Sequence, residues 1–158
     1  MTKLFVIVFA CFAFALVVII KFLLLFCESK EKRLCRISNN YYLLKKLYST
    51  EEEAIAKYIM DKGYKSIAIY GYGDIGRIFL QILIRNSMPV NYIIDRVPKE
   101  ALYNVPVYQL SNELEKVDIV IVSLSQNYNS VINDLKKYGL HNSVLLSDIL
   151  SKCDRVYK

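Results

Sequence analysis

The chain has 158 residues, a hydrophobic content of 54% and a formal net charge of +6. This length fits one domain with an additional segment and excludes two full-sized domains. The four cysteines show no C-x-x-C spacing and there is a single histidine, so the sequence predicts no metal site. The basic residues form no stripe interleaved with aromatic residues, and we therefore expect no nucleic-acid partner.

An apolar run at residues 4–26 contains one charged residue, Lys21. As a helix rising about 1.5 Å per residue it is about 34 Å long, enough to cross a bilayer core of about 30 Å. Lys21 lies near the end of the run, where its ammonium group can reach the interface. A cleaved signal peptide is the alternative, but the apolar run continues beyond the A-x-A at Ala13 and Ala15. The sequence predicts a transmembrane anchor at residues 1–27, within a lipid bilayer.

The charges that flank this run predict its orientation. Lys3 and the α-amino group precede it, whereas residues 28–46 hold an excess of Lys and Arg over Glu. Positive charge favours the cytoplasmic side, so we expect a single-pass protein of the cell membrane with its C-terminal domain in the cytoplasm. Residues 28–48 are interpreted as a basic juxtamembrane connector, which includes a short interfacial helix over residues 41–48.

The predicted folded domain covers residues 49–158. Ser49 and Thr50 precede three glutamates, which is the pattern of a capping box for a helix that runs to about Lys62. Gly63 then ends this helix.

Strand and helix patterns alternate through the rest of the chain. The predicted elements are strand 67–70, helix 75–83, strand 90–94, an extended piece at 105–108, a short helix from Ser111, strand 118–124, helix 126–138, strand 143–146 and helix 148–153. This alternation predicts an α/β fold, a small parallel Rossmann-like sheet with helices on both faces. The expected order across the sheet is 105–108, 90–94, 67–70, 118–124 and 143–146.

Three glycines follow the first predicted strand at G-x-G-x-x-G spacing. Gly71 permits a tight turn, Gly73 lets the backbone approach a phosphate, and Gly76 lets the helix pack closely on the strand. The helix start offers N–H groups and a partial positive charge, which suit an anion. Asp95 ends the second strand, about where an acid meets ribose hydroxyls. The pattern therefore predicts a nucleotide-binding loop.

Two residues favour the alternative that the glycines serve only the turn. Tyr72 places a large ring beside the loop, and Asp74 places a carboxylate where it can satisfy the helix N–H groups and repel a pyrophosphate. Arg96 can pair with Asp95 or accept a 2′-phosphate, so NAD and NADP both remain open.

Polar residues also lie at the tip of strand 118–124, at the edge of the sheet that faces the glycine loop: Ser123, Ser125, Gln126 and Asn127. They can hydrogen-bond a ligand's sugar or base, or cap the next helix. The candidate binding residues are Gly71, Tyr72, Gly73, Asp74, Ile75, Gly76, Asp95, Arg96, Ser123 and Ser125. No catalytic residue is predicted, because each Y-x-x-x-K pair precedes the loop and His141 has no evident partner.

Residues 65–150 resemble a known module through the segments IAIYGYGDIGR, VNYIIDR, NVPVYQL and DIVIVSL. The module is the Rossmann-like, CoA-binding-like or nucleotide-sugar-binding accessory domain of membrane-bound surface-polysaccharide biosynthesis proteins. These include capsule-type nucleotide-sugar dehydratases/epimerases and the N-terminal domains of sugar acetyltransferases. The resemblance matches the family's glycine loop to Gly71, Gly73 and Gly76 and its acid to Asp95, whereas Asn104 replaces the glycine of the family's G-x-P-V turn.

The resemblance implies a membrane-anchored, cytoplasm-facing nucleotide- or nucleotide-sugar-binding module, accessory to polysaccharide or glycoconjugate biosynthesis. NAD(P) or a nucleotide sugar is the implied ligand, and a glycosyltransferase or another polysaccharide-assembly protein the implied partner. One alternative is an NAD(P)-dependent oxidoreductase or epimerase completed by a partner chain. Another is a nucleotide-sensing regulatory domain of a transport system, although residues 107–110 lack the Gly-Asp pair of such domains in potassium transport.

Overall fold

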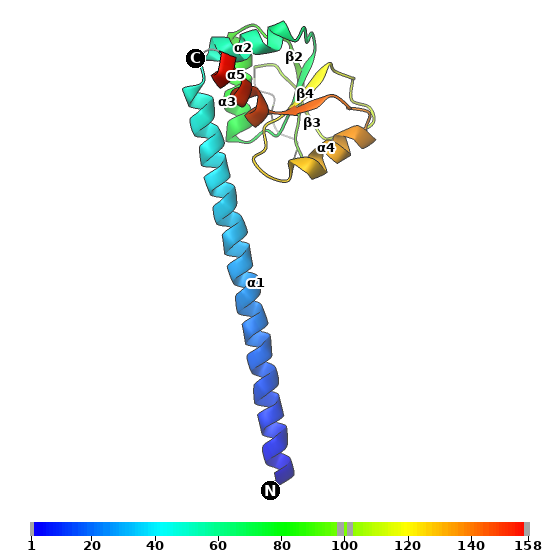
Figure 1. Ribbon diagram of the computed structural model, residues 1–158. Helices are drawn as coiled ribbons and strands as arrows, with labels where there is room; N and C mark the ends of the chain where they lie inside the picture. Colours follow the sequence, from blue (N-terminus) through cyan, green and yellow to red (C-terminus); the bar gives the residue numbers. More distant parts are fainter. Residues whose placement is uncertain (1, 98–99, 101–102, 157–158) are drawn as a thin grey trace. The chain divides into compact units, whose positions relative to one another are not determined.

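The computed structural model describes the backbone of residues 2–97, 100 and 103–156, and the side chains of residues 14–97, 100 and 103–153. The chain divides into two compact units, residues 1–38 and residues 39–158. Figure 1 shows the second unit as a sheet with helices around it. The predicted α/β class is confirmed for this unit.

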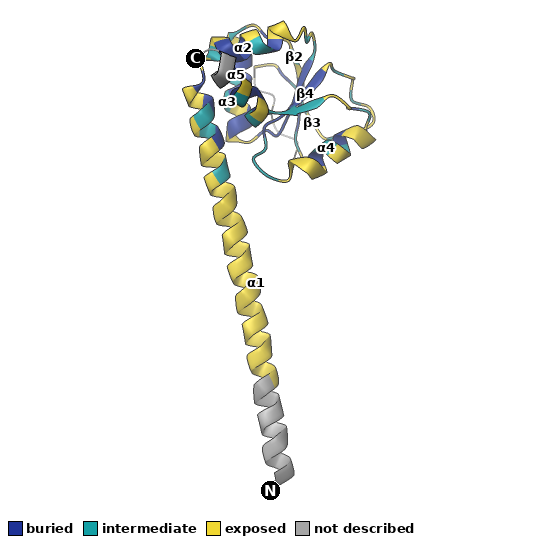
Figure 2. Ribbon diagram, viewed as in Figure 1, coloured by how far each residue is buried: buried dark blue, intermediate teal, exposed yellow. Residues whose placement is uncertain are grey.

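Helix α1 (Thr2–Ser49) is continuous, where the sequence predicts an anchor, a connector and a short helix. Between residues 14 and 26 its large apolar side chains, such as Phe14 and Leu25, are exposed (Figure 2). Among the described residues, no helix is long and apolar enough to cross a membrane. The predicted anchor includes residues 4–13, whose side chains lie outside the described part of the chain.

Five parallel strands form one sheet in the order β3-β2-β1-β4-β5, and this confirms the predicted order. The strands are β1 (Ile67–Tyr70), β2 (Val90–Ile94), β3 (Val107–Tyr108), β4 (Ile119–Val122) and β5 (Ser143–Leu145). The other helices are α2 (Glu52–Asp61), α3 (Asp74–Arg85), α4 (Tyr128–Lys137) and α5 (Leu146–Val156).

Alternate residues of the central strands point to opposite faces of the sheet. Ile67 and Ile69 belong to a core cluster that includes residues of α2, α3, α5 and the end of α1. Ala68 and Tyr70 belong to a second cluster, to which α4 is the only helix to contribute among the described residues. One face of the sheet is therefore covered by several helices, and the other by α4 and a loop.

The connection from β3 to β4 crosses the α4 face without a helix, so the helix predicted from Ser111 is wrong. Residues 112–114 form turns, and the apolar side chains of residues 110–117 pack against the α4-side cluster. Between β3 and β4 the chain crosses β2 and β1, which is three strand spacings of about 4.8 Å each. It also has to return from the carboxyl edge of the sheet to the amino edge. An extended chain covers more length per residue than a helix, which rises about 1.5 Å per residue.

The predicted capping box does not form. Glu51 is the N-cap residue of α2, and no side-chain hydrogen bond caps this end. The hydroxyls of Ser49 and Thr50 instead donate to the Lys46 carbonyl, at 3.0 and 2.9 Å. Helix α1 continues up to Ser49, so these hydroxyls donate to a carbonyl in the last turn of α1 instead of capping the start of α2. The glycine predicted to end α2, Gly63, has the left-handed φ of +72° typical of that position.

The last turns of α1 belong to the folded domain. The second unit begins at Asn39, before the predicted start at residue 49. Leu43 and Leu47 are buried in the core cluster, whereas Tyr41 and Tyr48, which the sequence places on an interfacial face, are exposed. Helix α1 therefore enters the core of this unit through its leucines.

Asp118 joins the starts of β1 and β4. Its Oδ2 accepts the N–H groups of Lys65 and Ser66 at 2.7 and 3.0 Å, and its own N–H donates to Ser66 Oγ at 2.8 Å. The two backbone hydrogen bonds hold the pKa of Asp118 below its ordinary value of 3.8, because they favour the ionised carboxylate.

We predict that Leu47→Ala lowers the free energy of unfolding of the full chain by about 2–5 kcal/mol, because it leaves a cavity in the core. The matched control is Leu34→Ala in the same helix, where the leucine is 69% exposed. This control should change the free energy by less than about 0.5 kcal/mol. Urea unfolding followed by circular dichroism measures both, and equal small effects would contradict the placement of Leu47.

We predict that Asp118→Asn destabilises the fold at pH 7 and that its deficit against wild type shrinks in acid. A carboxyl with a lowered folded pKa contributes stability above its unfolded pKa and loses it as the pH falls through the folded pKa. The deficit should therefore fade below about pH 3.8. Urea midpoints for both proteins at pH 7 and at progressively lower pH test this, and a deficit independent of pH would refute it.

Candidate functional site

The carboxyl ends of β1 and β4 form the switch point of the sheet. From β1 the chain passes through α3 to β2 on one side, and from β4 through α4 to β5 on the other. The two helices pack on opposite faces of the sheet. In open parallel sheets, ligands bind beyond the carboxyl ends of the strands at this point. The glycine loop, residues 71–76, follows β1 here.

Gly71 and Gly76 are required by the fold itself. Gly71 has a φ of +100°, and a Cβ atom there would lie 2.9 Å from Ser123 Oγ. A Cβ atom on Gly76 would lie 1.9 Å from the Gly71 carbonyl oxygen, closer than any real contact. Helix α3 can approach the end of β1 only because Gly76 has no side chain.

Gly73 has no such internal reason. It is exposed, its φ of −79° is open to any residue, and a Cβ atom there would meet nothing within 4 Å. Gly73 is the N-cap residue of α3, so no side chain caps this helix start. The Asp74 carboxylate, which the sequence offers as a cap, is exposed in the first turn. Gly73, the second glycine of the motif, thus leaves the backbone at the start of α3 open to solvent.

Tyr72 turns its ring into the protein. The side chain is 3% exposed and belongs to the same core cluster as Ile75 and Phe79. The guanidinium of Arg77, one turn into α3, lies 5.0 Å from the centre of the Tyr72 ring. From the sequence alone, the Tyr72 ring could project from the loop and obstruct a ligand. In the structure the ring is buried and does not project into solvent.

Asp95 holds the glycine loop. Its Oδ2 accepts the Tyr72 N–H at 2.7 Å, and its Oδ1 accepts the Val97 N–H at 3.1 Å. An ionised carboxylate has about four acceptor sites, so these bonds and a ribose contact do not exclude each other. The hydrogen bond from Val97 belongs to a local turn of the kind that aspartate favours, and the sequence allows it. The hydrogen bond from Tyr72 cannot be inferred from the sequence. Arg96 beside it is exposed, and its carbonyl accepts the Gln109 amide at 3.0 Å.

The two serines after β4 have separate partners within the chain. Ser123 is buried, and its Oγ lies 3.0 and 2.9 Å from the carbonyl oxygens of Tyr70 and Gly71. Its single proton is therefore engaged with the end of β1. Ser125 Oγ donates to Asn40 Oδ1 of α1 at 2.5 Å.

Neither serine caps α4. The N-cap residue of α4 is Asn127, in the left-handed conformation with a φ of +57°, and it makes no side-chain cap. Asn40 is a neighbour of the site that the sequence does not indicate, because it precedes Ser125 by 85 positions.

The uncapped start of α3 and the exposed Arg77 are the features of the switch point that suit an anion. At the switch point, no described side chain caps the N–H groups at the start of α3, and Arg77, an exposed residue, lies in the first turn of this helix. His141 precedes β5, so it lies at the amino edge of the parallel sheet, opposite the glycine loop. Among the described residues, no group of three or more His, Cys, Asp or Glu side chains is placed to hold a metal ion.

Comparisons of this chain with protein-family models, with curated proteins and with solved structures find no match. The resemblance to polysaccharide-biosynthesis proteins therefore remains an expectation that rests on the sequence segments quoted above.

We predict that Gly76→Ala destabilises the fold by about 1–3 kcal/mol or more, because the new methyl group overlaps the Gly71 carbonyl. Gly73→Ala is the matched control at the same loop, and it should change the free energy of unfolding by less than about 1 kcal/mol. Thermal and urea unfolding measure the pair. A stable Gly76→Ala variant would show that α3 does not pack against β1 as described.

Proposed function

We propose that the second unit binds a nucleotide or a nucleotide sugar through its phosphates, at the loop between β1 and α3. The observation that carries this proposal is Gly73, an exposed glycine for which neither the backbone conformation nor the packing gives a reason. A glycine at this position lets a bulky anion approach the backbone.

The charges around the loop decide how an anion is held. The first turn of α3 supplies N–H groups and the positive end of the helix dipole. Arg77 adds an exposed cation, whose guanidinium lies over the Tyr72 ring. Asp74 opposes an anion, so binding depends on the backbone and on Arg77.

Asp95 is the proposed partner of the ribose hydroxyls. It lies at the end of β2, next to the glycine loop to which it is hydrogen-bonded. An acid in this position meets the ribose when the phosphates lie at the helix start. NAD(P) and nucleotide sugars share this phosphate and ribose chemistry, and both belong to the proposed ligand class.

We also propose that residues 4–26 anchor the protein in the cell membrane, with the second unit in the cytoplasm. Support comes from the apolar sequence, from the basic residues that follow it, and from the exposed apolar side chains of residues 14–26. The family resemblance supports an accessory role in polysaccharide or glycoconjugate assembly, beside a glycosyltransferase or a similar partner.

We predict saturable binding of at least one of NAD, NADP, CoA and a UDP-sugar to the full chain, measured by calorimetry. Gly73→Ala should weaken this binding by about tenfold or more, which is about 1.4 kcal/mol, because its methyl group separates the phosphates from the N–H groups. Asn133→Ala, at an exposed position of α4, is the control and should bind as wild type does.

Two outcomes contradict the proposal. If none of the four ligands binds saturably, the glycine loop serves the fold alone. If a ligand binds and Gly73→Ala leaves its affinity unchanged, the binding site lies elsewhere in the chain.

A further inference from the structure

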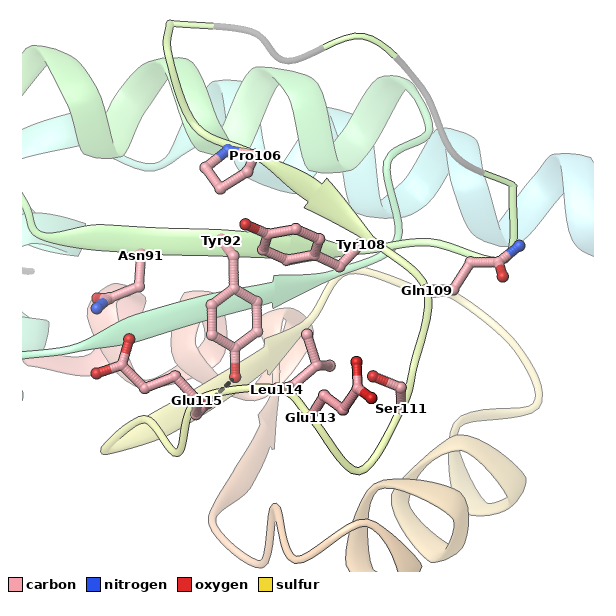
Figure 3. A pocket seen from close by; sticks show the side chains of 9 residues that line it. All are labelled: Asn91, Tyr92, Pro106, Tyr108, Gln109, Ser111, Glu113, Leu114 and Glu115. Carbon is pink, nitrogen blue, oxygen red and sulfur yellow. Dashed lines mark hydrogen bonds between the residues drawn. The ribbon is translucent and has the colours of Figure 1, made fainter.

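A pocket of about 530 Å³ opens on the other side of β2 from the first core cluster, at the edge formed by β2 and β3. Figure 3 shows that its lining comes from β2, from β3 and the residue before it, and from the crossover loop that follows β3. No residue of the glycine loop lines it. Its volume is within the range of small-molecule sites, about 300–1,000 Å³.

The missing helix between β3 and β4 explains why this pocket exists. The loop that replaces the helix passes beside β2 and is held there by Tyr92, whose hydroxyl donates to the Glu115 carbonyl at 2.5 Å. Tyr92 is 3% exposed and forms the floor. The space between this floor and the loop is the pocket.

Two aromatic rings meet in the pocket. The rings of Tyr92 and Tyr108 are tilted by 60°, with 6.0 Å between their centres. Tyr108 is 46% exposed, so a face of its ring is accessible to a ligand. Such faces carry partial negative charge and attract cations.

The charged residues of the pocket are all acidic. None of the nine lining residues is Lys, Arg or His, although the chain contains 21 Lys and Arg. Glu113 and Glu115 line it, and neither takes part in an ion pair with the described part of the chain. In the view of Figure 3 the Glu113 carboxylate lies on one side of the Tyr92 ring and the Glu115 carboxylate on the other.

The Tyr92 phenol responds to this environment. Burial, and after it the charge of Glu115, raise its pKa. The neutral phenol thus persists as a hydrogen-bond donor that keeps the loop in place. Polar groups of Asn91 and Ser111 complete the lining beside the carboxylates.

We propose that this pocket binds a small organic cation with a primary ammonium or guanidinium group, held between the two carboxylates and the face of Tyr108. The ligand is opposite in charge to the one proposed for the glycine loop. The two sites share no lining residue, so this proposal stands whether or not the glycine loop binds a nucleotide.

Calorimetry with the full chain tests the proposal, with agmatine as the probe because it carries both an ammonium and a guanidinium group. Agmatine should bind saturably, whereas glucose and glutamate should not. Glu113→Gln and Glu115→Gln should each weaken binding by about threefold or more, and the double variant by about tenfold or more. Glu53→Gln, which changes an exposed carboxylate on α2, is the matched control and should bind as wild type does.

A second pair of variants tests the aromatic wall. Tyr108→Leu should also weaken agmatine binding, while Tyr128→Leu, which changes a tyrosine of similar exposure on α4, should not. These positions are exposed, so the fold is expected to survive each change. Absence of saturable agmatine binding, unchanged affinity in the double glutamine variant, or equal binding of glucose would each overturn the proposal.

Discussion

The close approach of Gly76 to the carbonyl of Gly71 is the constraint on which the rest of this structure depends. It brings the first turn of α3 against the end of β1, and a single methyl group would prevent it. Ser123 adds a bond from β4 to the same carbonyl, and Asp95 adds one from the end of β2 to the loop. The glycine loop is therefore held by contacts at the ends of three neighbouring strands, β2, β1 and β4.

If the glycine loop binds the proposed ligand, its backbone already has a fixed conformation before binding. The N–H groups at the start of α3 do not have to be ordered on binding, and preorganisation of this kind improves affinity. The same network uses groups that a ligand would otherwise meet, since Ser123 and part of Asp95 are engaged with the backbone. Under the proposed function, recognition at the glycine loop would rely on main-chain N–H groups and Arg77 more than on the polar side chains around them.

The uneven covering of the sheet accounts for the pocket beside β2. Helices α2, α3 and α5 and the leucines of α1 fill one face, whereas α4 and an extended crossover cover the other. Because the crossover has no helix, a pocket with acidic and aromatic walls remains beside β2. The two proposed sites of this small sheet therefore have opposite electrostatic requirements, since the glycine loop would take an anion and the pocket a cation.

The strands and their order follow from the sequence, because the runs at Ile67 and Ile119 are apolar on both faces and alternate with helical patterns. The features that the sequence did not predict depend on contacts between residues far apart in the chain. The burial of Leu47 depends on the core that the last turns of α1 meet. The residues after Ser111 form turns instead of the predicted helix, and apolar side chains of this loop pack against the α4-side cluster. The bond from Asp95 to Tyr72 joins residues 23 positions apart, so local pattern does not contain it.

The most direct test of the account is the position of the backbone amides that respond to a ligand. Amide proton–nitrogen spectra of the labelled full chain would be recorded during titration with NAD and then with a UDP-sugar. If the phosphates bind at the start of α3, the largest shifts fall on Gly73, Asp74, Ile75 and Gly76. Shifts confined to other segments, or none in this loop at saturating ligand, would contradict the account.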